Sequence, residues 1–125
     1  IPLFSQILDA RSIDELLLML EIKGNSEIPP ISLDTKYLII INLVCPFLVC
    51  YSQYMDNYDY SEFAVDLLEK IPAEKNSIVQ ARRKAGFDVP SAYYSQAVLQ
   101  LENEYCRSRK CAECQVGRYY ISRPL

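Results

Sequence analysis

The stretch from Tyr37 to Tyr51, YLIIINLVCPFLVCY, decides the fold of this chain. It is the longest apolar run of the sequence, and Asn42 interrupts it with a polar amide. A membrane span needs about 20 apolar residues, so this shorter run predicts a central buried helix, kinked at Pro46. A strand over residues 37–44 stays open as an alternative, because isoleucine and valine favour strands. The side chains around the proline that we expect to be buried are Ile40, Leu43, Phe47 and Leu48.

Helical signals recur on both sides of the central run. Ser12 and Glu15 form a capping box that begins one helix, and Gly24-Asn25 ends it. Only three glycines are present, which argues against a turn-rich β sandwich. The sequence therefore predicts an all-α fold, an irregular bundle of about five helices with a C-terminal cysteine-bearing loop, as a single domain over residues 1–125. The further helices that we expect cover residues 2–9, 59–71, 74–85 and 92–106.

Three of the five cysteines, Cys106, Cys111 and Cys114, lie within nine residues in a C-x4-C-x2-C pattern. Thiolates at such spacing can converge on zinc or an iron–sulfur cluster, although a closed site normally needs a fourth ligand. Cys50 could supply that ligand only if the end of the central helix meets the tail. Reduced structural thiols and a disulfide (106–111 or 111–114) remain alternatives. Cys45 and Cys50 themselves are interpreted as core residues of the central helix.

The charge of the chain is unevenly distributed. Residues 1–104 carry eight Lys/Arg and fifteen Asp/Glu, a balance of −7, whereas residues 105–125 carry five cations and one acid, a balance of +4. Tyrosines interleave with these cations, as they do on many nucleic-acid surfaces. A solvated helix end explains the pattern equally well. The candidate nucleic-acid contacts are Arg107, Arg109, Lys110 and Arg118.

The sequence contains no histidine, which excludes Cys2His2 zinc sites and both Ser-His-Asp and Cys-His catalysis within this chain. We therefore expect no catalytic centre here. An odd number of cysteines and no evident signal peptide favour a reducing compartment, and we expect a cytoplasmic protein without a membrane partner. The chain begins Ile1-Pro2 and runs straight into an apolar pattern, so we expect it to be the C-terminal part of a longer protein.

Two stretches resemble a known family. Residues 38–48 are similar to its "I-N-x-x-x-P-F-L" segment, and residues 95–117 are similar to its closing pattern "S-Q-x-x-x-x-L…Y-C-x4-C-x2-C-x-x-G", which ends at Gly117. The family is a group of uncharacterised Bacteroidetes proteins, domain-of-unknown-function family 2851. The likeness spans roughly residues 33–121, with segments in the same order.

The resemblance implies that an N-terminal half precedes this chain in the whole protein, and that this half looks like a metal-dependent nuclease of the restriction-endonuclease type. Such nucleases hold their cation with an Asp and a Glu-x-Lys on adjoining strands. Glu21-Ile22-Lys23 has that spacing but falls on a predicted helix, so we interpret it as coincidence.

Two functions remain open from the sequence. The first is a helical accessory domain that supports the nuclease-like half and contacts nucleic acid through the basic tail. The second is a protein-interaction or structural module with no role in nucleic-acid binding. A continuous positive patch joining Arg82-Arg83-Lys84 to the tail would favour the first. The oligomeric state cannot be derived from these residues.

Overall fold

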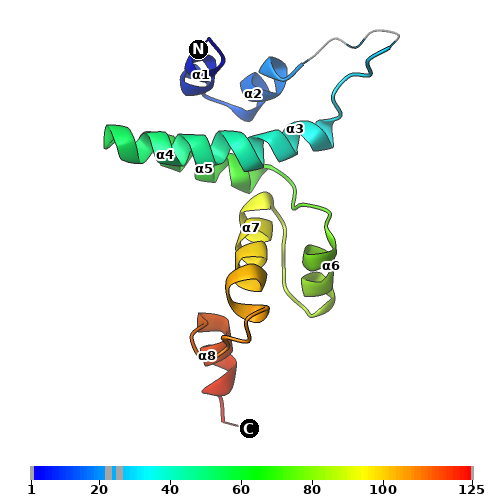
Figure 1. Ribbon diagram of the computed structural model, residues 1–125, viewed down its shortest axis with the longest axis vertical. Coiled ribbons are helices and arrows are strands. Elements are labelled where there is room, and N and C mark those ends of the chain that lie inside the picture. Colours follow the sequence, from blue (N-terminus) through cyan, green and yellow to red (C-terminus); the bar gives the residue numbers. More distant parts are fainter. Residues whose placement is uncertain (1, 22–23, 25–26, 125) are drawn as a thin grey trace. The chain divides into compact units, whose positions relative to one another are not determined.

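The computed structural model describes residues 2–21, 24 and 27–124, and it is helical (Figure 1). The chain divides into two compact units, Ile1–Ile71 and Pro72–Leu125, and each is described by itself. Within the described residues there is no strand, only an isolated bridge between Pro72 and Ser91. The all-α prediction is therefore confirmed, and the strand alternative for residues 37–44 is wrong.

The first unit begins with two short helices, α1 (Pro2–Asp9) and α2 (Ile13–Met19). Ser12 caps α2 as predicted, because its hydroxyl accepts a hydrogen bond from the Glu15 amide at 3.3 Å. The Glu15 carboxylate in turn accepts from the Arg11 amide at 2.9 Å. The Glu-x-Lys triplet and the Gly24-Asn25 helix end lie partly outside the described residues.

The central helix is longer than the sequence predicts. Three segments join without a break, α3 (Leu33–Ile39), η1 (Ile40–Val44) and α4 (Cys45–Met55), and together they form one helix of 23 residues (Figure 1). The middle segment is a π-helix, in which backbone bonds close five residues along, as from the Cys45 amide to the Ile40 carbonyl. This wider turn ends at Val44, two residues before Pro46, which cannot donate an amide hydrogen bond. The π segment thus lets the helix continue through the proline.

The π segment also explains one wrong prediction about the core. Ile40 and Leu48 are fully buried, as expected, and Phe47 is half-buried. Leu43, however, is 54% exposed, and Val44 is buried in its place. Because a π turn holds more residues than an α turn, the residue that returns to the inner side comes one position later.

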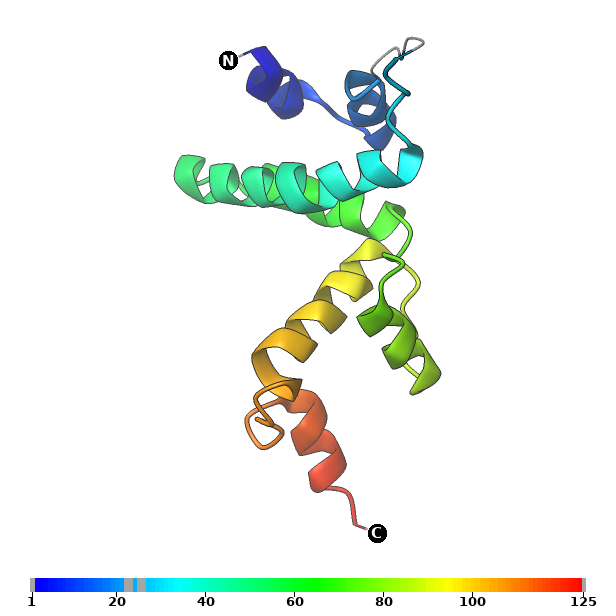
Figure 2. The ribbon, with the colours of Figure 1, turned by 45° about the vertical axis from the view of Figure 1, so that its right-hand side comes forward.

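The inner side of the central helix packs along α5 (Asp59–Lys70), which lies beside α4 (Figure 2). Ala64 and Leu67 of α5 are buried at this contact. A run of aromatic rings extends the packing, with centroid distances of 5.0 Å, 6.0 Å and 5.1 Å for the successive pairs of Phe4, Phe47, Tyr51 and Tyr60.

The second unit contains α6 (Ser77–Lys84), α7 (Ala92–Gln100), η2 (Leu101–Cys106) and α8 (Gln115–Ile121). Helices α6 and α7 pack side by side (Figure 2). The segment η2 is a second π-helix and continues α7 directly. The residues of α7 that are buried are Ala92, Ser95 and Val98, whereas Tyr94 is 48% exposed. The small core of this unit comprises Ala73, Val79, Val89 and Val98, with Ile78 and Phe87 packed against it.

When α3–η1–α4 and α7–η2 are each counted as one helix, the described residues form seven helices rather than about five. The cysteine-bearing segment is a turn between η2 and α8, a helix that the sequence did not predict. The prediction of one domain over residues 1–125 is not tested by the division into two units and stays a prediction.

Candidate functional site: the cysteine-bearing basic tail

The tail leaves η2 through a tight turn. The Arg109 amide donates to the Cys106 carbonyl at 3.1 Å, and the Lys110 amide donates to the Tyr105 carbonyl at 2.9 Å. This pair of bonds defines a Schellman motif, which reverses the chain after a helix. Arg109 takes the left-handed position of the motif, with φ of 53°. This conformation costs a non-glycine residue about 1–2 kcal/mol of conformational free energy. The turn therefore has an arginine at a position where glycine would be less strained.

The turn is then fastened onto α8. A Cβ atom added to Gly117 would lie 2.1 Å from the carbonyl oxygen of Cys111, so only glycine permits this close approach. The Arg118 side chain strengthens the contact, because its Nε donates to the Ala112 carbonyl at 2.7 Å. The glycine of the closing sequence pattern therefore has a structural reason, the packing of the cysteine turn on α8.

The three tail cysteines occupy different environments. Cys106 is half-buried, Cys111 is exposed and Cys114 is buried, and all three are free thiols. Among the described residues, no group of three or more Cys, Asp or Glu side chains is arranged to hold a metal ion. Zinc or iron–sulfur binding by Cys106, Cys111 and Cys114 stays a prediction.

The two cysteines of the central helix differ as well. Cys45 is buried and its thiol donates to the Ala64 carbonyl at 3.7 Å. Burial raises the pKa of the Cys45 thiol to about 12, because the thiolate would lose its hydration. Cys45 is therefore a core residue, as predicted. Cys50 is exposed, so its assignment to the core was wrong.

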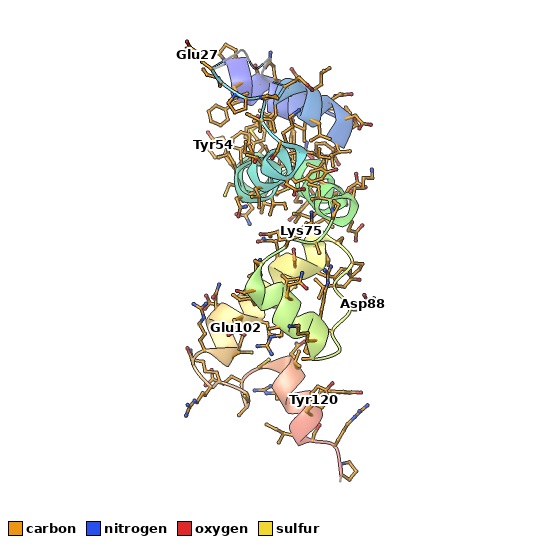
Figure 3. The ribbon with its side chains drawn as sticks, turned by 90° about the vertical axis from the view of Figure 1, so that its right-hand side faces the viewer. Glu27, Tyr54, Lys75, Asp88, Glu102 and Tyr120 are labelled. Atoms are coloured by element: carbon orange, nitrogen blue, oxygen red, sulfur yellow. The ribbon has the colours of Figure 1, made fainter. Side chains whose placement is uncertain are left out.

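Two of the three basic residues at the end of α6 are engaged within the second unit. The Arg82 guanidinium donates to the Glu102 carboxylate (Glu102 is labelled in Figure 3), and both side chains are half-buried. The pKa of Arg82 is raised, mainly by the hydrogen bond to Glu102. Partial burial lowers the pKa of Arg82, whereas the nearby Cys106 raises it further. Arg83 donates to the Val89 carbonyl at 2.6 Å and so holds the loop before α7. These two cations do not offer the free patch that we considered from the sequence.

The cations of the tail turn are free by comparison. Arg107, Arg109 and Lys110 are exposed, and among the described residues no hydrogen bond or ion pair engages their side chains. Arg118 is exposed and uses one nitrogen on Ala112. Arg123 lies over the Tyr119 ring, 4.2 Å from its centroid. The structure therefore gathers the candidate nucleic-acid contacts on one turn and the helix that follows it.

Sequence reasoning missed a second feature, in the first unit. We call it the outward face: the exposed side chains of the central helix that share one side of it, namely Leu38, Leu43, Pro46, Val49 and Cys50. Asn42 lies among them, but its amide donates to the Leu38 carbonyl at 2.9 Å and so satisfies itself on its own helix. A signal was present in the sequence, because residues 37–55 contain no charged side chain on any side of the helix.

The length of this helix overturns one argument made from the sequence. Leu33–Met55 is long enough and apolar enough to cross a membrane, and a third of its most apolar window is buried. Length and composition alone are weak evidence, because the core helix of a soluble protein meets the same criterion. The absence of a membrane partner stays a prediction.

The described residues thus form an all-helical fold, and its tail turn carries three cations without a side-chain partner among these residues and ends in free thiols. Residues 19–77 match the family model described as protein of unknown function (DUF2851), so the resemblance to this family is confirmed over these residues. The match includes the central helix and ends before the cysteine-bearing tail. No curated protein and no solved structure matches the chain significantly.

Proposed function

We propose that this chain is a non-catalytic helical accessory domain that contacts nucleic-acid phosphates through Arg107, Arg109 and Lys110. The observation that supports this most is the contrast between these three cations and Arg82 and Arg83. The tail cations are exposed and unengaged among the described residues, whereas the other two hold internal partners. A free cation can neutralise a phosphate without first breaking an internal hydrogen bond.

The fixed geometry of the turn supports the same proposal. The two backbone bonds that close η2 and the packing of Cys111 on Gly117 hold the backbone of the three cations in place. Binding then orders only their side chains, and it costs less conformational entropy than binding by a flexible basic segment. Arg118 on α8 can add a further contact through the nitrogens that it does not use on Ala112.

The test compares two triple variants of equal net charge. Changing Arg107, Arg109 and Lys110 to alanine removes the tail cations, and changing Lys70, Lys75 and Lys84 to alanine removes three cations outside the tail. Affinity for a fluorescein-labelled 20-nucleotide DNA is measured by anisotropy at low salt. We expect the tail variant to lose at least about tenfold in affinity and the control to lose less than about twofold.

Equal losses in the two variants would mean that net charge alone matters, and the proposal would be wrong. No measurable binding by the unmodified chain would have the same consequence. Circular dichroism of both variants checks that the helices persist, which we expect because all three tail cations are exposed.

A second candidate function is that of a protein-interaction module, which the outward face of the central helix favours. Exposed apolar side chains at helical spacing typically mark a surface that another polypeptide covers. We propose as its partner the nuclease-like N-terminal half that the family resemblance implies.

The cytoplasm is the location that we propose for the whole protein.

Cys50 lies on the outward face and offers a direct test, since its thiol is exposed in this chain. Its alkylation by iodoacetamide is followed by mass spectrometry in this chain and in the full-length protein, with the exposed Cys111 as an internal reference. We expect Cys50 to react at least about tenfold more slowly in the full-length protein and Cys111 to react equally in both. An unchanged Cys50 rate would exclude the N-terminal half as the partner of this face.

A further inference from the structure

The helix α8 carries two adjacent tyrosines, Tyr119 and Tyr120, whose side chains remain more than half exposed. Tyr119 is 52% exposed and Tyr120 is 65% exposed. Their rings meet edge to face, with centroids 5.4 Å apart and an interplanar angle of 83°. Figure 3 marks Tyr120 on this last helix. Large aromatic side chains usually lose much of their exposure on folding, so an open pair calls for a reason.

The second unit contains another tyrosine pair that serves as a comparison. Tyr93 and Tyr94 on α7 have almost the same geometry, 5.5 Å and 83°, and are 42% and 48% exposed. No lysine or arginine occurs between residues 87 and 101, whereas Arg118 and Arg123 flank the pair on α8. An exposed tyrosine pair is therefore not unusual in this chain, but only one pair stands between cations.

The cations around the α8 pair are placed to act together with the rings. The Arg123 guanidinium lies 4.2 Å from the centroid of Tyr119 and also donates to its hydroxyl. Beside Tyr119 there is an open hollow of about 550 Å³ that contains no carboxylate in its lining. Its lining residues are Ala112, Gln115, Arg118, Tyr119, Ile121 and Ser122. The surface thus offers aromatic rings, an open space and positive charge at one place.

From this arrangement we infer that Tyr119 and Tyr120 form a stacking platform for unpaired bases, and that the polyanion bound by the tail is single-stranded nucleic acid. The inference rests on the proposed contact between tail cations and phosphates. Bases of a duplex are stacked on one another and hide their faces, whereas unpaired bases can stack on an exposed ring. Cations beside the rings then meet the phosphates that link successive bases.

The experiment measures three probes on the 125-residue chain: a 20-nucleotide single-stranded DNA of mixed sequence, the blunt duplex of the same sequence, and inorganic polyphosphate. The variants are Tyr119→Ala with Tyr120→Ala, the same positions changed to phenylalanine, and the matched control Tyr93→Ala with Tyr94→Ala. Phenylalanine keeps the ring and removes the hydroxyl, so it separates stacking from hydrogen bonding.

We expect the single strand to bind more tightly than the duplex. The alanine pair on α8 should weaken single-strand binding about 5- to 100-fold, the range for the loss of stacking on one base. It should leave polyphosphate binding within about twofold of the unmodified chain. The phenylalanine pair and the α7 control should both bind the single strand as the unmodified chain does.

Single-strand binding that is unchanged in the alanine pair on α8, or lost equally in the α7 control, would overturn the platform. Duplex binding as tight as single-strand binding would also overturn it. In these cases binding of polyphosphate through Arg107, Arg109 and Lys110 would still support the proposed function. If none of the three probes binds, both the inference and the proposed contact with phosphates are wrong.

Discussion

The outward face of the central helix and the basic tail both lie open to solvent, but their chemistry is opposite. Between Tyr37 and Met55 no residue is charged, whereas between Arg107 and Arg123 there are five cations and one acid. An apolar face gains free energy when another apolar surface removes it from water. Cations stay well hydrated alone and gain most from a dense array of anions that releases counterions. Two surfaces of one short chain therefore suit two different kinds of partner.

The two π segments show a parallel difference. In η1 three of five residues are buried, and the segment ends two residues before Pro46, which cannot donate an amide hydrogen bond. In η2 no residue is fully buried and there is no proline. Instead, η2 places Glu102 beside Arg82 and ends at Cys106, where the tail turn begins. The first π segment serves packing, and the second positions the start of the candidate site.

The largest effect that we predict is a difference in alkylation rate between Cys50, on the outward face of the central helix, and Cys45, on its buried side. Iodoacetamide at pH 8 should alkylate Cys50 more than about 1,000-fold faster than Cys45, as measured by mass spectrometry. Thiolate is the reactive form, and burial raises the pKa of the Cys45 thiol to about 12. Rates within tenfold of each other would show that both sides of the helix are equally open.

Core substitutions on the same helix sharpen this contrast. Leu48 is 0% exposed, and Leu48→Ala should lower the free energy of unfolding by about 2–5 kcal/mol. Leu43 is 54% exposed, and Leu43→Ala should cost less than about 1 kcal/mol. Urea unfolding followed by circular dichroism measures both changes. Similar costs for the two variants would place Leu43 in the core, where the sequence alone predicted it.

The smallest effect concerns Arg109, where stability and binding should change in opposite directions. Arg109→Gly should raise the free energy of unfolding by about 0.5–1 kcal/mol, because glycine adopts the left-handed conformation without strain. The same change removes one tail cation and should weaken binding of the 20-nucleotide DNA. Gly86→Ala is the matched control at another helix end, where φ is 93°, and it should destabilise the chain. A destabilised Arg109→Gly variant would contradict the strain assigned to this turn.

Local chemistry predicted much of the fold. The Ser12 cap and the end of the helix that we expected over residues 74–85 depend on neighbours within a few residues, and both were readable. The two π segments were not readable from the sequence. They depend on longer-range features: the accommodation of Pro46 in the central helix, and the contact of Glu102 in η2 with Arg82. The exposed position of Leu43 follows from η1 and was therefore missed as well.

The sequence predicted which residues belong to the candidate site but not how they are arranged. The +4 balance identified Arg107, Arg109, Lys110 and Arg118, and the structure leaves the first three unengaged among the described residues. The packing of the cysteine turn was not readable, because it depends on the close approach of Gly117 to Cys111 and on α8, a helix that the sequence did not predict. The different exposures of Cys106, Cys111 and Cys114 were not readable either.

The most direct test of the central claim is the salt dependence of single-stranded DNA binding. Each phosphate contact contributes about 0.7 to the slope of log affinity against log salt concentration for a single strand. Replacing Arg107, Arg109 and Lys110 with alanine should therefore reduce the magnitude of the slope by about 2, while the triple variant at Lys70, Lys75 and Lys84 should keep the slope of the unmodified chain. A tail variant with an unchanged slope would contradict the assignment of nucleic-acid binding to these three cations.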